Sequence, residues 1–120
     1  IFLYLFNHLT DQGQPPAPFE FVPHASQRAY VFRDLSLFSQ ADTEHHALEL
    51  AAMLGGFWTN LARSGRSPNG PGLPVWPAYS NASDSLVLLD GPANVTVTSG
   101  FRSAACDFHD RMLLLPHGRR

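Results

Sequence analysis

Several residue types and patterns are scarce or absent in this sequence, and each absence excludes a class of protein. Lysine does not occur, so all eight cationic side chains are arginines, and the formal net charge is −2. Apart from Arg119 and Arg120 the arginines are scattered, which argues against a surface that follows a phosphate backbone and against a nucleic-acid partner. No run of about 18 apolar residues is present, so no membrane-spanning helix is expected.

The usual sequence motifs of catalytic and cofactor sites are also absent. The sequence holds no Gly-x-Ser-x-Gly nucleophile elbow, no glycine-rich phosphate loop and no Cys-x-x-Cys pair. His45 and Glu49 stand four residues apart, a spacing that could place both on a metal ion. Without a third ligand nearby, a solvated helix face is the better interpretation. We therefore expect neither a metal nor a cofactor.

Cysteine is nearly absent, and the single residue, Cys106, leaves two interpretations open. In a cytosolic protein it would be a buried thiol, whereas in a secreted protein an odd cysteine points to a partner elsewhere. Two sequons, Asn81-Ala82-Ser83 and Asn94-Val95-Thr96, are possible glycosylation sites if the chain enters a secretory pathway. Their presence in one segment favours a secreted or extracellular protein.

What is present is enough apolar material for one small domain. Of the 120 residues, 44% are apolar and 12% aromatic, so the chain can bury a core. Residues 1–6 form a continuous apolar run without alternation, which is typical of a strand buried on both faces of a sheet. Such a strand needs neighbours on each side. The rest of the chain offers only short strands, so we expect part of a larger sheet.

The remaining pattern predicts two helices and a hairpin. The first helix is expected to start at Asp42 or Thr43 and to stop before Gly65. It contains the glycine pair Gly55-Gly56, which is unfavourable in a helix, and we expect close packing against another element to explain the pair. The hairpin is predicted from residues 86–89 and 95–98, with Asp90-Gly91 at the turn, and the second helix spans 101–115. The expected buried stripes are Ala47, Leu50, Ala51, Leu54, Trp58 and Leu61 in the first helix, and Phe101, Ala105, Phe108 and Met112 in the second.

His24 is the histidine whose position draws attention. It lies after the proline-rich loop 10–23 that follows the first strand, and working residues of α/β sheets lie on loops beyond the carboxyl ends of strands. Position alone nevertheless favours a structural or surface role for His24 over a catalytic one. His8, His109 and His117 show no arranged partners in the sequence.

Four stretches in the same order resemble the C-terminal portion of the type-B carboxylesterases, the family that includes the cholinesterases. "IFLYLFNH" resembles a late strand of the family sheet, and "VPHASQRAYVF" resembles the segment that carries the catalytic histidine. "FWTNLARSGRSPNGPGLPVWPAY" and "CDFHDRMLLL" resemble two later family segments. The resemblance spans nearly the whole chain, so residues 1–120 are expected to be the C-terminal portion of one carboxylesterase domain.

This resemblance implies an α/β fold, namely the C-terminal part of an α/β-hydrolase fold that is incomplete as an isolated chain. It implies that His24 is the triad histidine of a serine ester hydrolase, with a carboxylic ester as substrate and with the serine and the acid upstream. It also implies a disulfide from Cys106 to an upstream cysteine. Because family members often pair through C-terminal helices, a homodimer formed in that way is a further expectation.

Four positions depart from the family pattern and keep a second interpretation open. Phe21 stands where the family usually has glycine, Gln27 where it has glutamate, Arg28 where it has an aliphatic residue, and His109 where it has tryptophan. The alternative is therefore a non-enzymatic cholinesterase-like adhesion or interaction protein, because a fold does not determine a function. On either interpretation the isolated chain is expected to be inactive.

Overall fold

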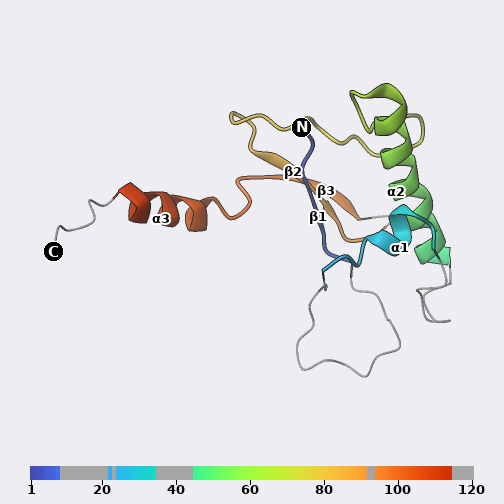
Figure 1. Cartoon of the computed structure of the whole chain (residues 1–120), viewed down its shortest axis with the longest axis horizontal. Coiled ribbons are helices and arrows are strands. Elements are labelled where there is room, and N and C mark those ends of the chain that lie inside the picture. Colours follow the sequence, from blue (N-terminus) through green and yellow to red (C-terminus); the bar gives the residue numbers. More distant parts are fainter. Residues whose placement is uncertain (9–21, 23, 35–44, 92–93, 115–120) are drawn as a thin grey trace, which may run out of the picture.

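The computed structural model of the chain describes residues 1–8, 22, 24–34, 45–91 and 94–114. These residues form, in order, β1 (Tyr4–Phe6), α1 (Arg28–Val31), α2 (His45–Ser64), β2 (Ser85–Leu89), β3 (Val95–Ser99) and α3 (Ser103–Leu114) (Figure 1). The strands make one sheet in the order β1-β2-β3, in which β1 and β2 are parallel and β2 and β3 antiparallel. The predicted mixed α/β character and the predicted hairpin are both confirmed.

The core lies between one face of this sheet and α2. The register places Tyr4 beside Val87 and Phe6 beside Leu89, so these four side chains share one face. Val87 and Leu89 are fully buried and belong to the same apolar cluster as Leu50, which is in α2. Alternation along β2 produces this burial, because every second residue from Ser85 to Leu89 points to the covered face.

Helix α2 follows the first part of the predicted apolar stripe. Ala47, Leu50, Ala51 and Leu54 are buried as expected. Met53 and Phe57 are also buried, although neither was in the predicted stripe, whereas Trp58 is only partly buried and Leu61, in the last turn, is 38% exposed. The helix ends as expected at Gly65, whose φ of +64° suits glycine and whose N–H donates to Leu61 O at 2.8 Å. The predicted starting residues Asp42 and Thr43 lie outside the described part of the chain.

The glycine pair in α2 lies where two other segments approach the helix. A Cβ added to Gly56 would lie 3.2 Å from Leu73 Cδ1, which is closer than an ordinary contact. A Cβ added to Gly55 would lie 3.8 Å from Arg33 Cδ, an ordinary contact distance. The predicted close packing is therefore confirmed at Gly56, where a side chain would displace Leu73.

The second face of β1 is open, in agreement with the expectation that the chain holds only part of a larger sheet. The strand is shorter than expected, since regular pairing is confined to three residues. Leu3, which points to that second face, is 39% exposed, and Ile1 is almost fully exposed. The physical reason is that α2 packs on one face only, and no described element lies over the other. A continuous apolar run therefore indicates that both faces of a strand need to be covered, but it does not identify the elements that cover them.

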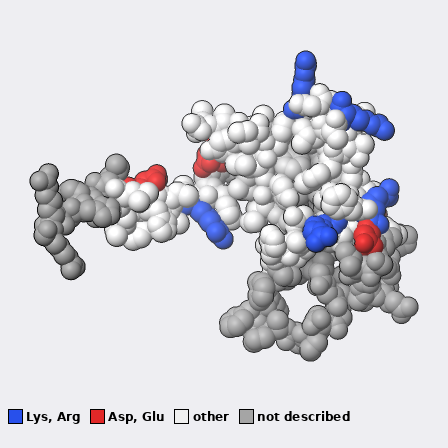
Figure 2. Space-filling view, in the orientation of Figure 1, with Lys and Arg blue, Asp and Glu red and all other residues white. Residues whose placement is uncertain are grey.

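Helix α3 stands apart from the rest of the described structure. We call β1–β3, α1, α2 and the connecting residues 65–84 the body; Figures 1 and 2 show α3 as a separate arm beside it. Every described residue from 101 to 113 is exposed, including the predicted stripe, so the expected burial of that stripe is not observed. No helix of the described chain is both long and apolar enough to span a bilayer.

Candidate active site around His24

His24 is held in a tight turn between the carboxyl end of β1 and the short helix α1. Residues 24–27 form the turn, and Ala25 adopts a φ of +68°, a left-handed conformation that an alanine rarely takes. The turn is closed by Arg28 N–H, which donates to Ala25 O at 3.0 Å, and it is continued by Val31 N–H, which donates to Gln27 O at 3.0 Å. The imidazole of His24 is thereby presented to solvent at the start of a helix.

A hollow of about 360 Å³ opens beside this turn. Its lining consists of Tyr4, Leu5, Phe6, Val22, His24, Ala25 and Gln27, so β1 forms one wall and the turn forms the other. Strand β1 is an edge strand of the described sheet. The structure therefore places His24 next to the end of the sheet where α/β proteins carry their working residues.

Among the described residues of the hollow, His24 is the group suited to act as a base. Apart from the His24 imidazole, the polar side chains of the described lining are the Tyr4 phenol and the Gln27 amide, and this lining includes no carboxylate, serine or cysteine. Neither His24 nor the side chain of Gln27 makes a hydrogen bond to a described residue. A histidine needs a nucleophile on one ring nitrogen and an orienting acid on the other to act as a triad base. The described lining offers neither.

The wall formed by β1 is buttressed by Trp76, which comes from the proline-rich connection after α2. The indole Nε1–H of Trp76 donates to Leu3 O at 2.9 Å. The side-chain amide of Asn69 holds the backbone of Trp76. Asn69 Nδ2 donates to Trp76 O at 2.9 Å, and Asn69 Oδ1 accepts from Trp76 N–H at 2.7 Å. The ring of Trp76 packs against Tyr4 with the centroids 5.5 Å apart.

The four prolines of residues 65–80 predict a loop, but that prediction did not include this support. The available signal was a tryptophan, whose indole carries an N–H donor, and an asparagine within a proline-rich segment. Prolines remove backbone donors, so the segment needs side-chain hydrogen bonds to hold its shape. The loop assignment itself is confirmed, since no helix or strand falls between Gly65 and Asp84.

No other described histidine is in the lining of the hollow, and one of them, His8, corrects the sequence analysis. His8 does have arranged partners: its ring contacts Phe6 and Tyr30, and its Nδ1 lies 3.3 Å from Asp90 O. His109 is exposed on α3 beside its neighbour Phe108. His117 and the side chain of His45 lie outside what the structure describes. Within the described residues no group of three or more histidine, cysteine, aspartate or glutamate side chains could hold a metal ion.

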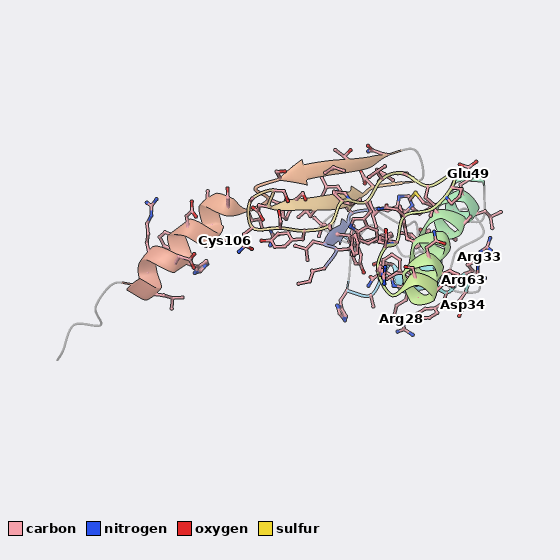
Figure 3. The ribbon with its side chains drawn as sticks, turned by 90° about the horizontal axis from the view of Figure 1, so that it is seen from above. Arg28, Arg33, Asp34, Glu49, Arg63 and Cys106 are labelled. Atoms are coloured by element: carbon pink, nitrogen blue, oxygen red, sulfur yellow. The ribbon has the colours of Figure 1, made fainter. Side chains whose placement is uncertain are left out.

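The residues predicted to be modified are all accessible. Cys106 is an exposed free thiol on α3, away from the body (Figure 3). Asn81 is exposed in the turn before β2. Asn94 is exposed before β3, and its amide donates to the Asp90 carboxylate at 3.2 Å. Accessibility is required for either modification, and all three positions meet this requirement.

A sequence profile described as the carboxylesterase family matches residues 1–109 of the chain. The chain belongs to the carboxylesterase family. Of the residues that depart from the family pattern, Gln27 is half-buried in the lining of the hollow and Arg28 is exposed on α1, while Phe21 lies outside the described residues. His109, which stands where the pattern has tryptophan, is exposed on α3.

Individual relatives agree with this assignment. The chain is 29% identical over 113 residues to the acetylcholinesterase of Gallus gallus, a match that covers 94% of this chain and 14% of the relative. It is 30% identical over 115 residues to carboxylesterase 5A of Canis lupus familiaris, covering 90% of this chain and 19% of the relative. The chain thus spans less than a fifth of the length of these curated relatives.

A solved structure supports the fold. A PNB esterase superposes with a TM-score of 0.68 at 23% identity, covering 96% of this chain and 22% of the esterase. The α/β arrangement of the carboxylesterase chain therefore corresponds to about a fifth of an α/β-hydrolase chain.

Proposed function

We propose that this chain is the C-terminal portion of a serine carboxylesterase domain and that His24 supplies its catalytic base. The observation that supports the proposal most directly is the position of His24, exposed in a turn at the carboxyl end of β1 and facing the hollow of about 360 Å³. Membership of the carboxylesterase family supports the reaction class. The substrate would be a carboxylic ester bound by the whole domain.

In this proposal the residues of the chain perform one part of acyl transfer. A ring nitrogen of His24 would accept the proton of a serine hydroxyl as the hydroxyl attacks the ester carbonyl, and would return that proton to the leaving alcohol. A carboxylate on the other ring nitrogen would hold the tautomer. The same cycle with water as the attacking group would release the acid. Because the described lining of the hollow holds no serine and no carboxylate, the proposal takes both groups from other segments of the protein.

The proposal is tested on the whole protein with a short-chain aryl ester such as p-nitrophenyl acetate. His24→Ala is expected to lower kcat by about 10⁴-fold or more, because triad members act as a unit. His109→Ala, an exposed histidine on α3, is the matched control and should retain wild-type kcat. Equal kcat for His24→Ala and the wild type would eliminate the hydrolase proposal. The isolated 120-residue chain should show no turnover above background.

A second candidate is a non-enzymatic interaction protein of the same family. The observation that favours it is Gln27, which lines the hollow beside His24 where the family pattern has glutamate. Gln27→Glu separates the two proposals. A clear rise in kcat would show that a charge near the histidine matters for an enzyme, whereas absent turnover in both forms would favour the interaction protein.

The exposed positions suggest how the whole protein is processed and assembled. We propose that it enters the secretory pathway, carries glycans at Asn81 and Asn94, and bonds Cys106 to a cysteine outside this chain. The stripe on α3 is the proposed homodimer contact. Non-reducing mass mapping of the protein from a secretory host tests the modifications, and a free Cys106 thiol together with two unmodified asparagines would reject them. A monomer at micromolar concentration in sedimentation equilibrium would reject the dimer.

A further inference from the structure

A cluster of three rings forms at the carboxyl end of β1, immediately beside the segment that carries His24. The His8 ring lies 6.2 Å from the Phe6 ring and 5.6 Å from the Tyr30 ring, both nearly perpendicular to it. The Phe6 and Tyr30 rings are themselves 5.4 Å apart. Edge-to-face ring contacts are favourable beyond the area they bury, because the positive edge of one ring meets the negative face of the other. The three rings therefore hold one another in place.

His8 also connects the cluster to the neighbouring strand β2. Its Nδ1 lies 3.3 Å from Asp90 O, the first residue after β2. In the neutral tautomer with the proton on Nδ1, the imidazole donates this hydrogen bond. The distance is long and the site is exposed, so the bond is weaker than the ring contacts. The imidazole thus links the ends of the two parallel strands, 82 residues apart in sequence.

Tyr30 connects the cluster to His24. Tyr30 is fully buried and lies in α1, the four-residue helix that begins directly after the turn of residues 24–27. The hydrogen bond from Arg28 N–H to Ala25 O makes the turn and the helix one unit. A shift of Tyr30 on the sheet therefore carries His24 with it. Figure 1 shows α1 lying beside the carboxyl end of β1.

We propose that His8 is a positioning residue: through its ring contacts with Tyr30 and Phe6 it sets where the His24 turn lies relative to the end of β1. The inference rests on the proposed function of His24 as base. A general base must lie about 2.6–3.2 Å from the heavy atom that carries the proton it takes. A displacement of about 1 Å can lower the rate by about 10²-fold. Removing one of the rings that hold Tyr30 should therefore reduce kcat more than it changes substrate binding.

The test compares two substitutions at His8 in the whole protein. His8→Phe keeps a ring of similar outline and removes the hydrogen bond to Asp90 O, whereas His8→Ala removes both. His109→Ala is the control for loss of an unrelated histidine, and His24→Ala is measured in parallel. The values of kcat and KM are determined with p-nitrophenyl acetate. For the wild type and the His8 and His109 variants kcat is expressed per active site titrated to completion with a fluorophosphonate, so that only correctly assembled enzyme is counted; for His24→Ala it is expressed per folded protein, because the reagent needs the activated serine.

We expect His8→Ala to lower kcat by about 10- to 100-fold with KM within about 3-fold of wild type, and His8→Phe to retain kcat within about 3-fold. A merely structural role would lower the number of titrated sites and leave kcat per site unchanged. If His8→Ala yields no folded protein, His8→Ser and His8→Leu take its place with the same expected loss relative to His8→Phe.

Three outcomes overturn the inference. Wild-type kcat per site in the variants without a ring would show that the ring does not position His24. Equal losses in His8→Phe and His8→Ala would show that the ring contacts do not carry the effect. Wild-type kcat in His24→Ala, or no turnover in the wild type, would reject the proposed function itself and the positioning role with it. An inactive His24→Ala with an unaffected His8→Ala rejects only the positioning role.

Discussion

Helices α2 and α3 have the same kind of sequence pattern and very different surroundings. Both repeat apolar residues at spacings of three and four. In α2 the repeat is covered: Leu50, Leu54 and Phe57 have no exposed surface. In α3 it is open: Phe108 is 60% and Met112 51% exposed, and Figure 3 shows the helix projecting away from the body. An apolar stripe therefore identifies the face of a helix that needs a partner, but it does not identify the partner.

The comparison has an energetic consequence. An isolated helix of the length of α3 is marginal in water, because helix nucleation is unfavourable and most helical stability in proteins comes from packing. Helix α2 obtains that packing from the sheet, as the Tyr4 and Trp58 rings illustrate with centroids 5.3 Å apart. Helix α3 obtains none from the described residues. Substitutions on the two helices should therefore act differently on the unfolding of the body.

The largest difference is expected between the phenylalanines of the two stripes. Phe57→Ala should lower the free energy of unfolding by about 3–5 kcal/mol, because it opens a cavity beside Trp76, whose ring centroid is 5.2 Å from that of Phe57. Phe108→Ala should change it by no more than about 0.5 kcal/mol, because the side chain is exposed. Urea unfolding followed by tryptophan fluorescence measures both, since both tryptophans belong to the body. Similar losses for the two variants would mean that α3 packs on the body.

A smaller effect should distinguish the two glycines of α2. Gly55→Ala should raise the free energy of unfolding by about 1 kcal/mol, since alanine favours the helix and the new Cβ would meet Arg33 Cδ at an ordinary 3.8 Å. Gly56→Ala should gain little, because its Cβ would lie 3.2 Å from Leu73 Cδ1 and would displace that side chain. The same urea titrations compare them. An equal gain at both positions would show that Leu73 moves aside freely and that this side of α2 is loosely packed.

The smallest effect should come from two residues in the left-handed region of backbone conformation, one in the body and one beside α3. Ala25 has a φ of +68° and Arg102 a φ of +60°. Ala25→Gly should raise the free energy of unfolding of the body by about 0.5–1 kcal/mol, because glycine adopts this conformation without a Cβ clash. Arg102→Gly relieves the same strain outside the body and should leave the fluorescence midpoint unchanged. A shift of the midpoint by Arg102→Gly would indicate that the arm and the body unfold together.

Much of this molecule could be predicted from local sequence because the signals are local. The end of α2 at Gly65 depends on one residue that tolerates a positive φ, and the hairpin depends on alternation around a turn. The accessible turn that holds His24 was predicted from its place after a strand. Its role as base stays a proposal, since no described residue of the hollow's lining could serve as its nucleophile or its acid.

Long-range contacts account for what the sequence could not show. The partners of His8 are Tyr30 and Asp90, 22 and 82 positions away, and no spacing rule connects a histidine to them. The bond from Trp76 to Leu3 O joins residues 73 positions apart. The sequence by itself determined which faces are apolar, because the period of a helix or a strand is a property of the local backbone. Only the tertiary structure decided which of those faces are covered, because burial depends on the element that packs against each face.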